Sequence, residues 1–558
     1  MEAKYLVYHL HTQLSSLITN IDSVNSFNDY IKRAKEYGMT ALAFSEHGNV
    51  YEWKHKKDAV EKAGMKYIHA IEAYITEKPF WENEDGENVK RRDNYHCVLI
   101  AKNYEGVKEI NELSSRAFKR EDGHFYYNPR IFFDELLNTS KNIIITTACI
   151  GGILYKGNEE IKNKFIAFLK ENKDRCFLEI QHHDVESQKE YNKYLYELSK
   201  DTGVRLVAGT DTHCLDKIHA EARIILQRAK NTYFSEEEGW DLTFKSYQGL
   251  VDAYKRQNCL PKEVYLEAIN NTNVIEEMVE PFSLDTSFKY PKISDSPNET
   301  LKKDVFGDEE KIQSIINEGY KKETVEERLK EEYETIKAVD ASEYILLQKH
   351  ITDWCHKNDI WTGPGRGSAA SSLILYLFNV TEINPLKHGF QFWRFMHKDK
   401  YSLADIDLDY SNEDREKVLS YMLKDHLNLD NIQTAHIITF NTIALRGAIK
   451  DIGRGLGLSI QETDKISKAV HEEADGENKI TVIDKEWREK YPELFKYVDV
   501  VIGTVVSMGS HPSGILVTDK DIGKEIGYCY ISGNDYPVTA LNMKELDSLN
   551  FVKFDVLG

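Results

Sequence analysis

The sequence predicts a multidomain α/β protein, from its length and from two patterns along the chain. At 558 residues the chain exceeds the size of one domain, and three or four domains are expected. Up to about residue 220, short apolar segments alternate with helix-like segments, and ligand-type side chains follow the apolar segments. This alternation predicts a β/α barrel whose functional residues gather at the carboxyl ends of its strands. Further along, a glycine-rich loop and a strand of alternating acids indicate a second, phosphate-handling domain.

Composition describes an ordinary globular protein of the cytoplasm. Hydrophobic residues make up 41% and charged residues 29% of the chain, and no apolar run reaches the roughly 18–20 residues that span a bilayer. The N-terminus has no secretory apolar region, and seven cysteines without paired spacing favour a reducing compartment over a disulfide framework. The net charge of −20 weakens nonspecific attraction to nucleic acid, so any contact with DNA requires local basic surface.

Two spaced pairs of metal-binding side chains bracket the repeat. Residues 4–8 form a predicted strand that leads into His9 and His11, and their period-two spacing points both imidazoles to one side. Asp211 and His213 follow the last strand of the repeat in the same way. Mixed nitrogen and oxygen ligands suit two or three clustered Zn, Mn or Mg ions that activate water.

Single histidines at strand ends carry less weight. They are more often capping or core residues than ligands, and we assign His69, His182 and His183 to that structural role. The helices between the strands are predicted over residues 26–37, 104–118 and 187–202.

Residues 4–220 resemble the polymerase and histidinol phosphatase (PHP) family of metal-dependent phosphoesterases. The resemblance rests on the HxH pair, a histidine in an Asp-His-Gly-like turn, a glutamate, a further histidine and the late DxH pair. It implies Zn²⁺ or Mn²⁺ bound by His9, His11, His47, Glu72, His96, Cys149, Asp211 and His213. The sequence departs from the family at two places. Glu46 replaces the usual Asp before His47, and Leu17 and Ile18 occupy a usual ligand position, for which Asp22 is a candidate substitute if the loop is longer.

A second candidate site lies between Trp361 and Tyr410. The loop from Gly363 to Ser372 supplies closely spaced backbone N–H groups at the start of a predicted helix, which by geometry and dipole is an anion site. In the predicted strand 404–410, Asp405, Asp407 and Asp409 project from one face. A glycine-rich loop alone is more typical of a tight helix-packing turn than of a phosphate site. The aligned carboxylates, which repel one another unless a cation lies between them, favour metal-assisted phosphoryl chemistry.

The whole chain resembles the alpha subunits of bacterial DNA polymerase III, the C-family replicative polymerases. The motifs that carry the resemblance occur at Gly363–Ser368, Asn384–Leu386, Trp393–Phe395, Asp405–Tyr410, Thr439–Thr442, Lys450–Arg454, His511–Gly514 and Lys553–Asp555. The implied architecture is a PHP-type β/α barrel with a helical extension over 1–285 and a nucleotidyltransferase-like (polymerase beta-like) α+β palm. The palm occupies 286–430 and 507–558, and a helical thumb insert occupies 431–506.

This resemblance also implies the roles of the second site. Asp405 and Asp407 would hold two Mg²⁺ ions, with Asp555 as the third carboxylate, for transfer of a dNTP to a primer 3′-hydroxyl. Asp409 is assigned to orienting its neighbours, or to the solvent end of the strand, rather than to the metal. The implied nucleotide-binding residues are Arg366, Gly367, Ser368, Arg394 and Lys553.

The insert is predicted to be mostly helical. Arg446, Lys450 and Arg454 fall at i, i+4 and i+8 of one helix, a stripe that is either a solvated face or a contact for the primer–template DNA. Residues 473–478 are expected to form an exposed acidic loop, and strands are expected at 500–502 and 514–517.

The predicted activity is template-directed DNA synthesis, in which the PHP domain could add a 3′–5′ exonuclease or phosphoesterase activity. The family continues past the point that corresponds to Gly558, so we expect a truncated or split polymerase whose fingers and clamp-binding region, which would contact the sliding clamp, lie on another segment or chain. Two alternatives remain at this stage: a metallophosphoesterase whose second half only positions DNA, and a noncatalytic assembly module. No membrane partner is expected.

Overall fold

The computed structural model describes residues 4–82, 87–232, 234, 237–399, 406–475 and 478–558. The chain divides into two compact units. Unit 1 comprises residues 1–283, 439–509 and 523–529, and unit 2 comprises 284–438, 510–522 and 530–558. No helix in the described part of the chain is long and apolar enough to cross a membrane.

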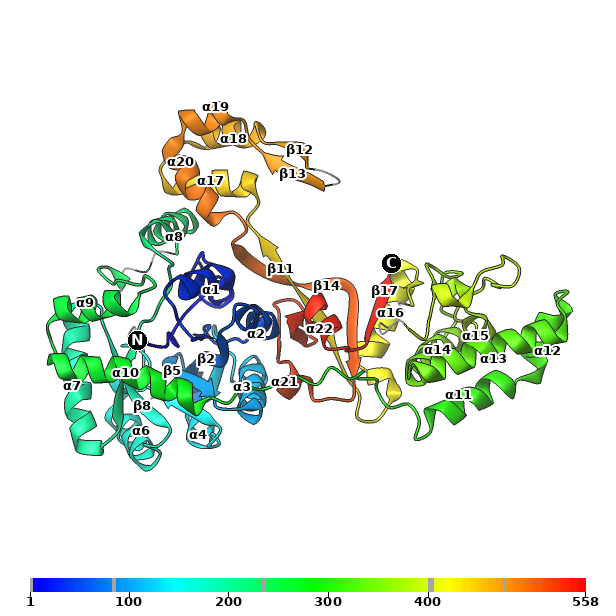
Figure 1. Cartoon of the computed structure of the whole chain (residues 1–558), viewed down its shortest axis with the longest axis horizontal. Helices are drawn as coiled ribbons and strands as arrows, with labels where there is room; N and C mark the ends of the chain where they lie inside the picture. The colour runs from blue at the N-terminus through cyan, green and yellow to red at the C-terminus, as the bar shows by residue number, and fades with distance from the viewer. Residues whose placement is uncertain (1–3, 83–86, 233, 235–236, 400–405, 476–477) are drawn as a thin grey trace. The chain divides into compact units, whose positions relative to one another are not determined.

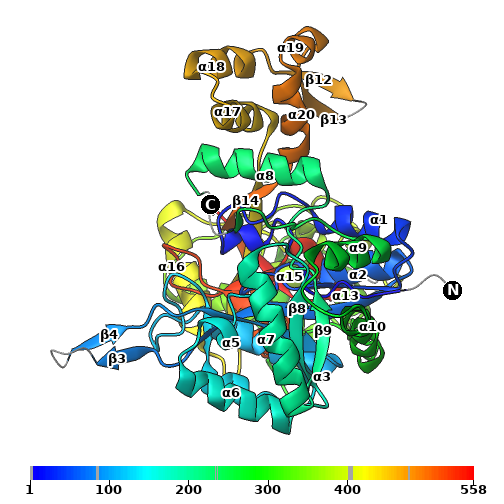
Figure 2. The same ribbon diagram turned by 90° about the vertical axis from the view of Figure 1, so that its left-hand side faces the viewer.

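A curled sheet with helices on its outside forms the body of unit 1. Its strands are ordered β1-β2-β5-β7-β8-β9, with β6 paired to β2, and helices such as α7 and α10 pack against β8 and β9 (Figures 1 and 2). Its strands are β1 (Ala41–Phe44), β2 (Lys66–Thr76), β5 (Tyr95–Ala101), β6 (Arg130–Phe132), β7 (Ile143–Thr146), β8 (Cys176–Gln181) and β9 (Arg205–Gly209). A separate hairpin consists of β3 (Phe80–Glu82) and β4 (Asn88–Lys90). The helices are α1 (Phe27–Glu36), α2 (Trp53–Lys62), α3 (Tyr104–Ala117), α4 (Phe133–Leu137), α5 (Ile153–Lys156), α6 (Glu159–Glu171), α7 (Glu186–Thr202), α8 (Lys217–Lys230), α9 (Tyr247–Gln257) and α10 (Lys262–Met278), with a 3₁₀ turn at Ser15–Leu17.

The sheet differs from the predicted barrel in two ways. β5 runs antiparallel to both β2 and β7, whereas the βα repeat predicts parallel strands throughout. Residues 4–8, predicted as a strand, have no strand geometry, although they bridge the two edges of the sheet. Ala43 N–H in β1 donates to the Val7 carbonyl, and Thr212 N–H beyond β9 donates to the His9 carbonyl. The segment therefore joins the edges and delivers His9 and His11 to the inside.

Residues 439–509 pack on α8 of the same unit. Figure 1 shows α17 and α20 lying over α8, and the contacts agree. A shared apolar core joins Ile225 and Leu226 of α8 to Ile449, Ile452 and Val498. The elements here are α17 (Leu445–Gly455), α18 (Ile460–Lys468), β12 (His471–Asp475), β13 (Asn478–Val482), α19 (Lys485–Lys490) and α20 (Pro492–Val501), with α21 (Ile522–Glu525) and β15 (Tyr528–Cys529) near the C-terminal end.

Two predictions for this segment are wrong. Val500 and Val501 belong to the end of α20 rather than to a strand, because Pro492 starts a helix whose Leu494, Phe495 and Val498 face the core. The acidic residues Glu473–Asp475 lie in β12 and Asn478 opens β13, so an antiparallel hairpin replaces the predicted loop.

Unit 2 is a mixed sheet with helices. Strands β10, β17, β14, β11 and β16 are neighbours in that order, and β11 and β14 are continuous with unit 1. The strands are β10 (Leu408–Asp409), β11 (Gln433–Thr442), β14 (Val505–Thr518), β16 (Val538–Asn542) and β17 (Lys553–Leu557). The helices are α11 (Pro297–Phe306), α12 (Glu309–Asn317), α13 (Lys322–Ala338), α14 (Ser342–Lys357), α15 (Leu373–Leu377), α16 (Asn412–Leu423) and α22 (Met543–Ser548), with 3₁₀ turns at Ala369–Ser371, Phe392–Arg394 and His426–Asn428. The predicted strand 514–517 is confirmed within β14.

Candidate metal centre and carboxylate face

Eight side chains from separate strands and loops, seven of them buried, converge inside the curled sheet of unit 1. Because β2 is eleven residues long, it carries Glu72 into the cluster, and because β5 is antiparallel, its first residues place His96 at the same end. Three overlapping groups have ligand atoms within 4.8 Å of one another: His11, Asp22, His47 and His213; His9, His11 and Asp211; and His47, Glu72 and His96. His11 and His47 belong to two groups each, which gives the geometry of a cluster of ions rather than of one isolated ion.

Glu72 lies at the centre of the cluster. Its two oxygens lie 2.8 Å from His47 Nδ1, 2.9 Å from His96 Nδ1 and 3.3 Å from His9 Nε2. Both Glu72 oxygens, His9 Nε2, His11 Nε2 and Asp22 Oδ2 are buried without a hydrogen-bond partner. Buried polar atoms are nearly always satisfied, so their convergence fits bound cations.

The other ring nitrogens are held by the protein. His9 Nδ1 lies 2.6 Å from Glu179 Oε1, His11 Nδ1 lies 3.1 Å from Ser15 Oγ, and His213 Nδ1 lies 2.9 Å from the Asp211 carbonyl. Such contacts set the tautomer and leave the second nitrogen of each ring facing the cluster. The histidines are therefore arranged as metal ligands.

The charges of the cluster are strongly coupled. Burial together with His47 and His213 lowers the pKa of His11 to about 4. Burial opposes the charged form of Asp22, but His213 and His47 outweigh it and hold the pKa of Asp22 well below its usual range. Burial also disfavours a charged His47, yet Tyr74, Asp22 and Glu72 hold its pKa well above the ordinary value. The cluster thus combines anionic carboxylates with imidazole rings, and the protonated rings must lose a proton before they bind a cation.

Sequence reasoning missed or left open several residues here. Asp22 does occupy the position expected of a ligand, whereas Glu46 accepts hydrogen bonds from Thr12 and Ser15 and pairs with Lys56 outside the cluster. Cys149 belongs to none of the three described groups, and its Sγ lies 3.4 Å from His96 Nδ1. The sequence analysis did not identify Glu179. Its carboxylate in the middle of the apolar strand β8 is the sequence feature that could have indicated a functional role.

The structural role of His69 is confirmed, because Tyr67 and Asn111 hold its ring nitrogens. His182 and His183 likewise lie outside the three groups.

The second candidate site is the open face of β10 and β17. The strands are parallel with Leu408 beside Val556, and both side chains point into the core, as do Ile406 and Phe554. Asp407 and Asp555 each precede this paired position by one residue and are half-buried on the opposite face. Only Leu408 and Asp409 of the predicted strand have strand geometry, and Asp405 lies outside the described residues.

Both regions of the chain match known protein families. Residues 8–183 match the PHP domain, and residues 301–558 match the bacterial DNA polymerase III alpha NTPase domain. DNA polymerase III subunit alpha of Aquifex aeolicus is 29% identical over all of this chain and 51% of its own length. The Borreliella burgdorferi subunit is also 29% identical over all of this chain, which covers 48% of that protein.

The chain belongs to the DNA polymerase III alpha family. It spans about half the length of the curated relatives it matches. An amidohydrolase from Chromobacterium violaceum superposes on 38% of the chain at 11% identity with a TM-score of 0.25, which is too loose to support an argument.

The glycine-rich loop differs from the predicted N-terminus of a helix. α15 has five residues, and the N–H groups of Leu373 and Ile374 donate to the carboxylate of buried Glu332. Ser372 and Arg328 bind the same carboxylate. The expectation of an anion site at this helix is therefore wrong, because a side chain of α13 already occupies it.

The earlier part of the loop remains available to a ligand. Among the described residues, no hydrogen-bond acceptor is found for the backbone N–H groups of residues 366–369, and Gly367 has a left-handed φ of 59° with open space beside it. Arg366 pairs at 3.3 Å with Asp409, Arg394 is exposed, and Lys553 pairs with Asp547. Asp409 is thus paired with an arginine, and its role away from the metal stays a prediction.

The cationic stripe of α17 is exposed but makes contacts within unit 1. Arg446 donates to the Val470 carbonyl, Lys450 pairs with Asp464 at 2.7 Å, and Arg454 donates to the Ala229 carbonyl. These contacts orient the three side chains and account for part of the stripe by packing. A DNA contact of the stripe stays a prediction.

Proposed function

We propose that unit 2 carries the site of template-directed DNA synthesis, with Asp405, Asp407 and Asp555 as the metal-binding carboxylates. The observation that carries this proposal is the parallel register of β10 and β17. Because Leu408 pairs with Val556, Asp407 and Asp555 occupy adjacent backbone positions on the open face. Two Mg²⁺ ions, when bound, would supply activation of the primer 3′-hydroxyl and charge neutralisation on the triphosphate.

Residues of the chain itself would bind and orient the substrate. The free N–H groups of residues 366–369 and the guanidinium groups of Arg366 and Arg394 would orient the triphosphate, and Lys553 adds positive charge beside Asp555. Ser513 Oγ donates to Asp555 Oδ1 at 3.3 Å, which holds that carboxylate in place.

Primer extension tests this site. Because the chain spans half of its relatives, the assay is run with and without a supplied C-terminal polypeptide of the same family. Asp407→Asn and Asp555→Asn should each abolish extension without changing thermal unfolding. Asp409→Asn should retain extension, because Asp409 faces Arg366. Normal extension by either of the first two variants contradicts the assignment.

We infer a second activity, metal-dependent phosphoester hydrolysis, for the PHP domain. The three overlapping ligand groups with their unpaired buried atoms support it. Zn²⁺ or Mn²⁺ bound there would supply an activated water. His96 is the most exposed of the converging ligands, with 22% of its side chain accessible, and so marks the side from which substrate enters. The function is supported if the protein cleaves an oligonucleotide in the presence of Mn²⁺ and the His9→Ala variant does not. It is contradicted if the purified protein contains no metal and shows no hydrolysis with added Mn²⁺.

A further inference from the structure

A surface of aromatic rings and cations is formed by the loop that precedes β6 together with the end of β4 and the residues that follow it. Three consecutive aromatic residues each have a cation against the ring face. Arg120 lies 4.4 Å from the Phe125 ring centre, Lys90 lies 5.4 Å from that of Tyr126, and Arg92 lies 5.9 Å from that of Tyr127. We name these six residues the aromatic–cation surface.

Tyr127 is the exposed end of this surface. Its side chain is 73% exposed, and its φ of 62° is unusual for a bulky residue. The ring centres of Tyr126 and Tyr127 are 4.6 Å apart. A strained backbone that holds a large ring in water favours a binding role over a packing role.

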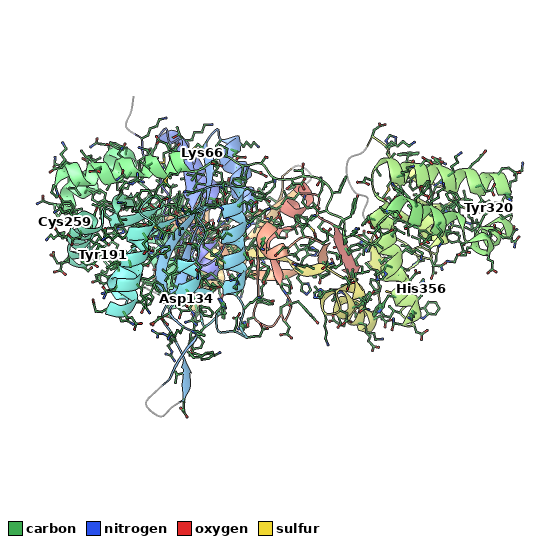
Figure 3. All side chains as sticks on the ribbon, turned by 90° about the horizontal axis from the view of Figure 1, so that it is seen from below. Lys66, Asp134, Tyr191, Cys259, Tyr320 and His356 are labelled. Carbon is green, nitrogen blue, oxygen red and sulfur yellow. The ribbon has the colours of Figure 1, made fainter. Side chains whose placement is uncertain are left out.

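Buried Arg130 connects the two segments that form the surface. Its guanidinium donates to the carbonyls of Gly123 and His124 in the aromatic loop, and to those of Arg91 and Asp93 at the base of the β3–β4 hairpin. Figures 2 and 3 show this hairpin projecting from the sheet. The two segments that supply rings and cations are therefore held together before any ligand binds, which lowers the entropic cost of binding.

The three cations have no acidic partner within the part of the chain that the structure describes. Lys90, Arg92 and Arg120 are exposed, and none of them forms an ion pair with another described residue. Neighbouring Arg91, in contrast, pairs with Glu77 and Asp93. In a chain of net charge −20, three cations without an acidic partner among the described residues, beside two adjacent tyrosine rings, indicate an anionic, planar ligand.

The surface adjoins the metal centre of the same unit. Tyr74 in β2 pairs with Arg130 in β6, and the Tyr74 ring stacks on the ligand His47 at 5.6 Å. A Cβ on Gly48, next to His47, would lie 2.7 Å from Pro129. Only Asn128 and Pro129 separate Tyr127 from β6, and Tyr74, the β2 partner of Arg130, also pairs with His96 of β5.

We propose that the aromatic–cation surface binds single-stranded nucleic acid and leads its end to the PHP metal centre. Bases stack on Tyr126 and Tyr127, and the backbone phosphates contact Lys90, Arg92 and Arg120. A duplex hides its base faces, so unpaired strands are the class of nucleic acid that fits exposed rings. The proposal rests on the inferred phosphoesterase function and gives that site its substrate class.

Fluorescence anisotropy with a labelled oligothymidylate of about 12 nucleotides tests the binding, with EDTA present so that no cleavage occurs. Tyr127→Ala should raise the dissociation constant about tenfold, since one stacked base is lost. Tyr127→Phe keeps the ring and should bind like the parent. Tyr194→Ala is the matched control, because Tyr194 is an exposed tyrosine on α7. An unchanged dissociation constant for Tyr127→Ala overturns the proposal and assigns the surface to a protein partner.

Salt dependence tests the cations separately. The double variant Arg92→Ala and Arg120→Ala should reduce the slope of log K against log salt by about 1.4, from two phosphate contacts on a single strand. An unchanged slope means that these cations do not contact the strand and overturns their part in the proposal.

Hydrolysis with Mn²⁺ separates this inference from the function on which it rests. Tyr127→Ala should raise KM for the oligonucleotide and leave cleavage of the small diester bis(p-nitrophenyl) phosphate unchanged. An unchanged KM refutes the link between the surface and the metal centre. If the parent protein cleaves neither substrate, the phosphoesterase function fails, and the EDTA measurement still decides whether the surface binds single strands.

Discussion

At the scale of single residues, the PHP centre depends on side chains that bind no metal themselves. Glu179 is the clearest case, since it accepts from Thr146 Oγ1 and Gln181 Nε2 while it holds His9. A Cβ on Gly209 would lie 1.9 Å from Glu179 Oε1, so β9 must leave room for this carboxylate. The orientation of His9 is therefore set by packing between β8 and β9.

Replacing Glu179 with Gln should weaken metal binding by about 10–100-fold, because the ring of His9 loses its anionic partner. A competition titration with a chelator dye measures this affinity. His69→Asn is the control, since His69 is a buried histidine with partners outside the cluster. Equal affinities for the Glu179 variant and the parent would contradict the role given to Glu179.

Metal binding should release protons near neutral pH. Despite burial, Glu179, Asp211 and Glu72 keep the pKa of His9 well above the ordinary value, so this ring is protonated without metal. Tyr74, Asp22 and Glu72 do the same for His47. Each of the two rings must lose its proton to bind a cation, and affinity should fall about tenfold per pH unit for each displaced proton as pH drops. His11, with a pKa lowered to about 4, releases none. Calorimetry in two buffers of different ionisation enthalpy counts the protons; no release would contradict this reading.

The residue pattern of the sequence identified ligands only where spacing is local. The pairs His9/His11 and Asp211/His213 follow from period-two spacing, and these residues do converge. Asp22 could be named only as a candidate, and Glu179 not at all, because their positions depend on how β8 and a loop pack against distant strands.

At the scale of elements, capping decides where the predicted helices begin. Ser26 forms a capping box with Asp29 at the start of α1, and Asn103 caps α3, so both helices begin within one residue of prediction. The end of α20 was mistaken for a strand because Val500, Val501 and Ile502 are β-branched, a local preference that packing against α17 overrides. The Glu332 anchor of α15 comes from a helix some forty residues earlier, beyond any local pattern.

Close packing of α17 on α8 gives an element-scale prediction. A Cβ on Gly455 would lie 2.2 Å from the Ile225 carbonyl oxygen, so Gly455→Ala should destabilise unit 1 by about 1–3 kcal/mol. Gly447→Ala on the same helix meets nothing closer than 3.8 Å and should stabilise it by about 0.5–1 kcal/mol. Thermal unfolding compares the pair, and equal stability of the two variants would show that the helices do not pack this closely.

At the scale of the whole molecule, the two candidate sites draw on separate sets of ligands. The metal centre uses residues of unit 1 alone, and the carboxylate face uses residues of unit 2 alone. The sequence predicts this division into two chemistries from its motifs. It does not predict that residues 439–509 share a core with α8, since that packing joins segments about 200 residues apart.

The two activities should therefore be separable. His9→Ala should remove Mn²⁺-dependent hydrolysis and leave primer extension unchanged, whereas Asp407→Asn should do the reverse. Both assays use the same preparation, with thermal unfolding as the check on folding. A variant that keeps its fold yet loses both activities would show that the sites act together.

The shared core on α8 also has a consequence during synthesis on the ribosome. When Ser283 has been made, the apolar face formed by Ala222, Ile225 and Leu226 still lacks its partners, and Trp53 lacks the Ile526 carbonyl to which its indole donates. Translation at about 5–20 residues per second leaves this first body incomplete for roughly 10–50 s, until Cys529 has emerged. The nascent N-terminal portion therefore exposes apolar surface to which a chaperone can bind. A chain that ends shortly after residue 283 should aggregate through the same surface.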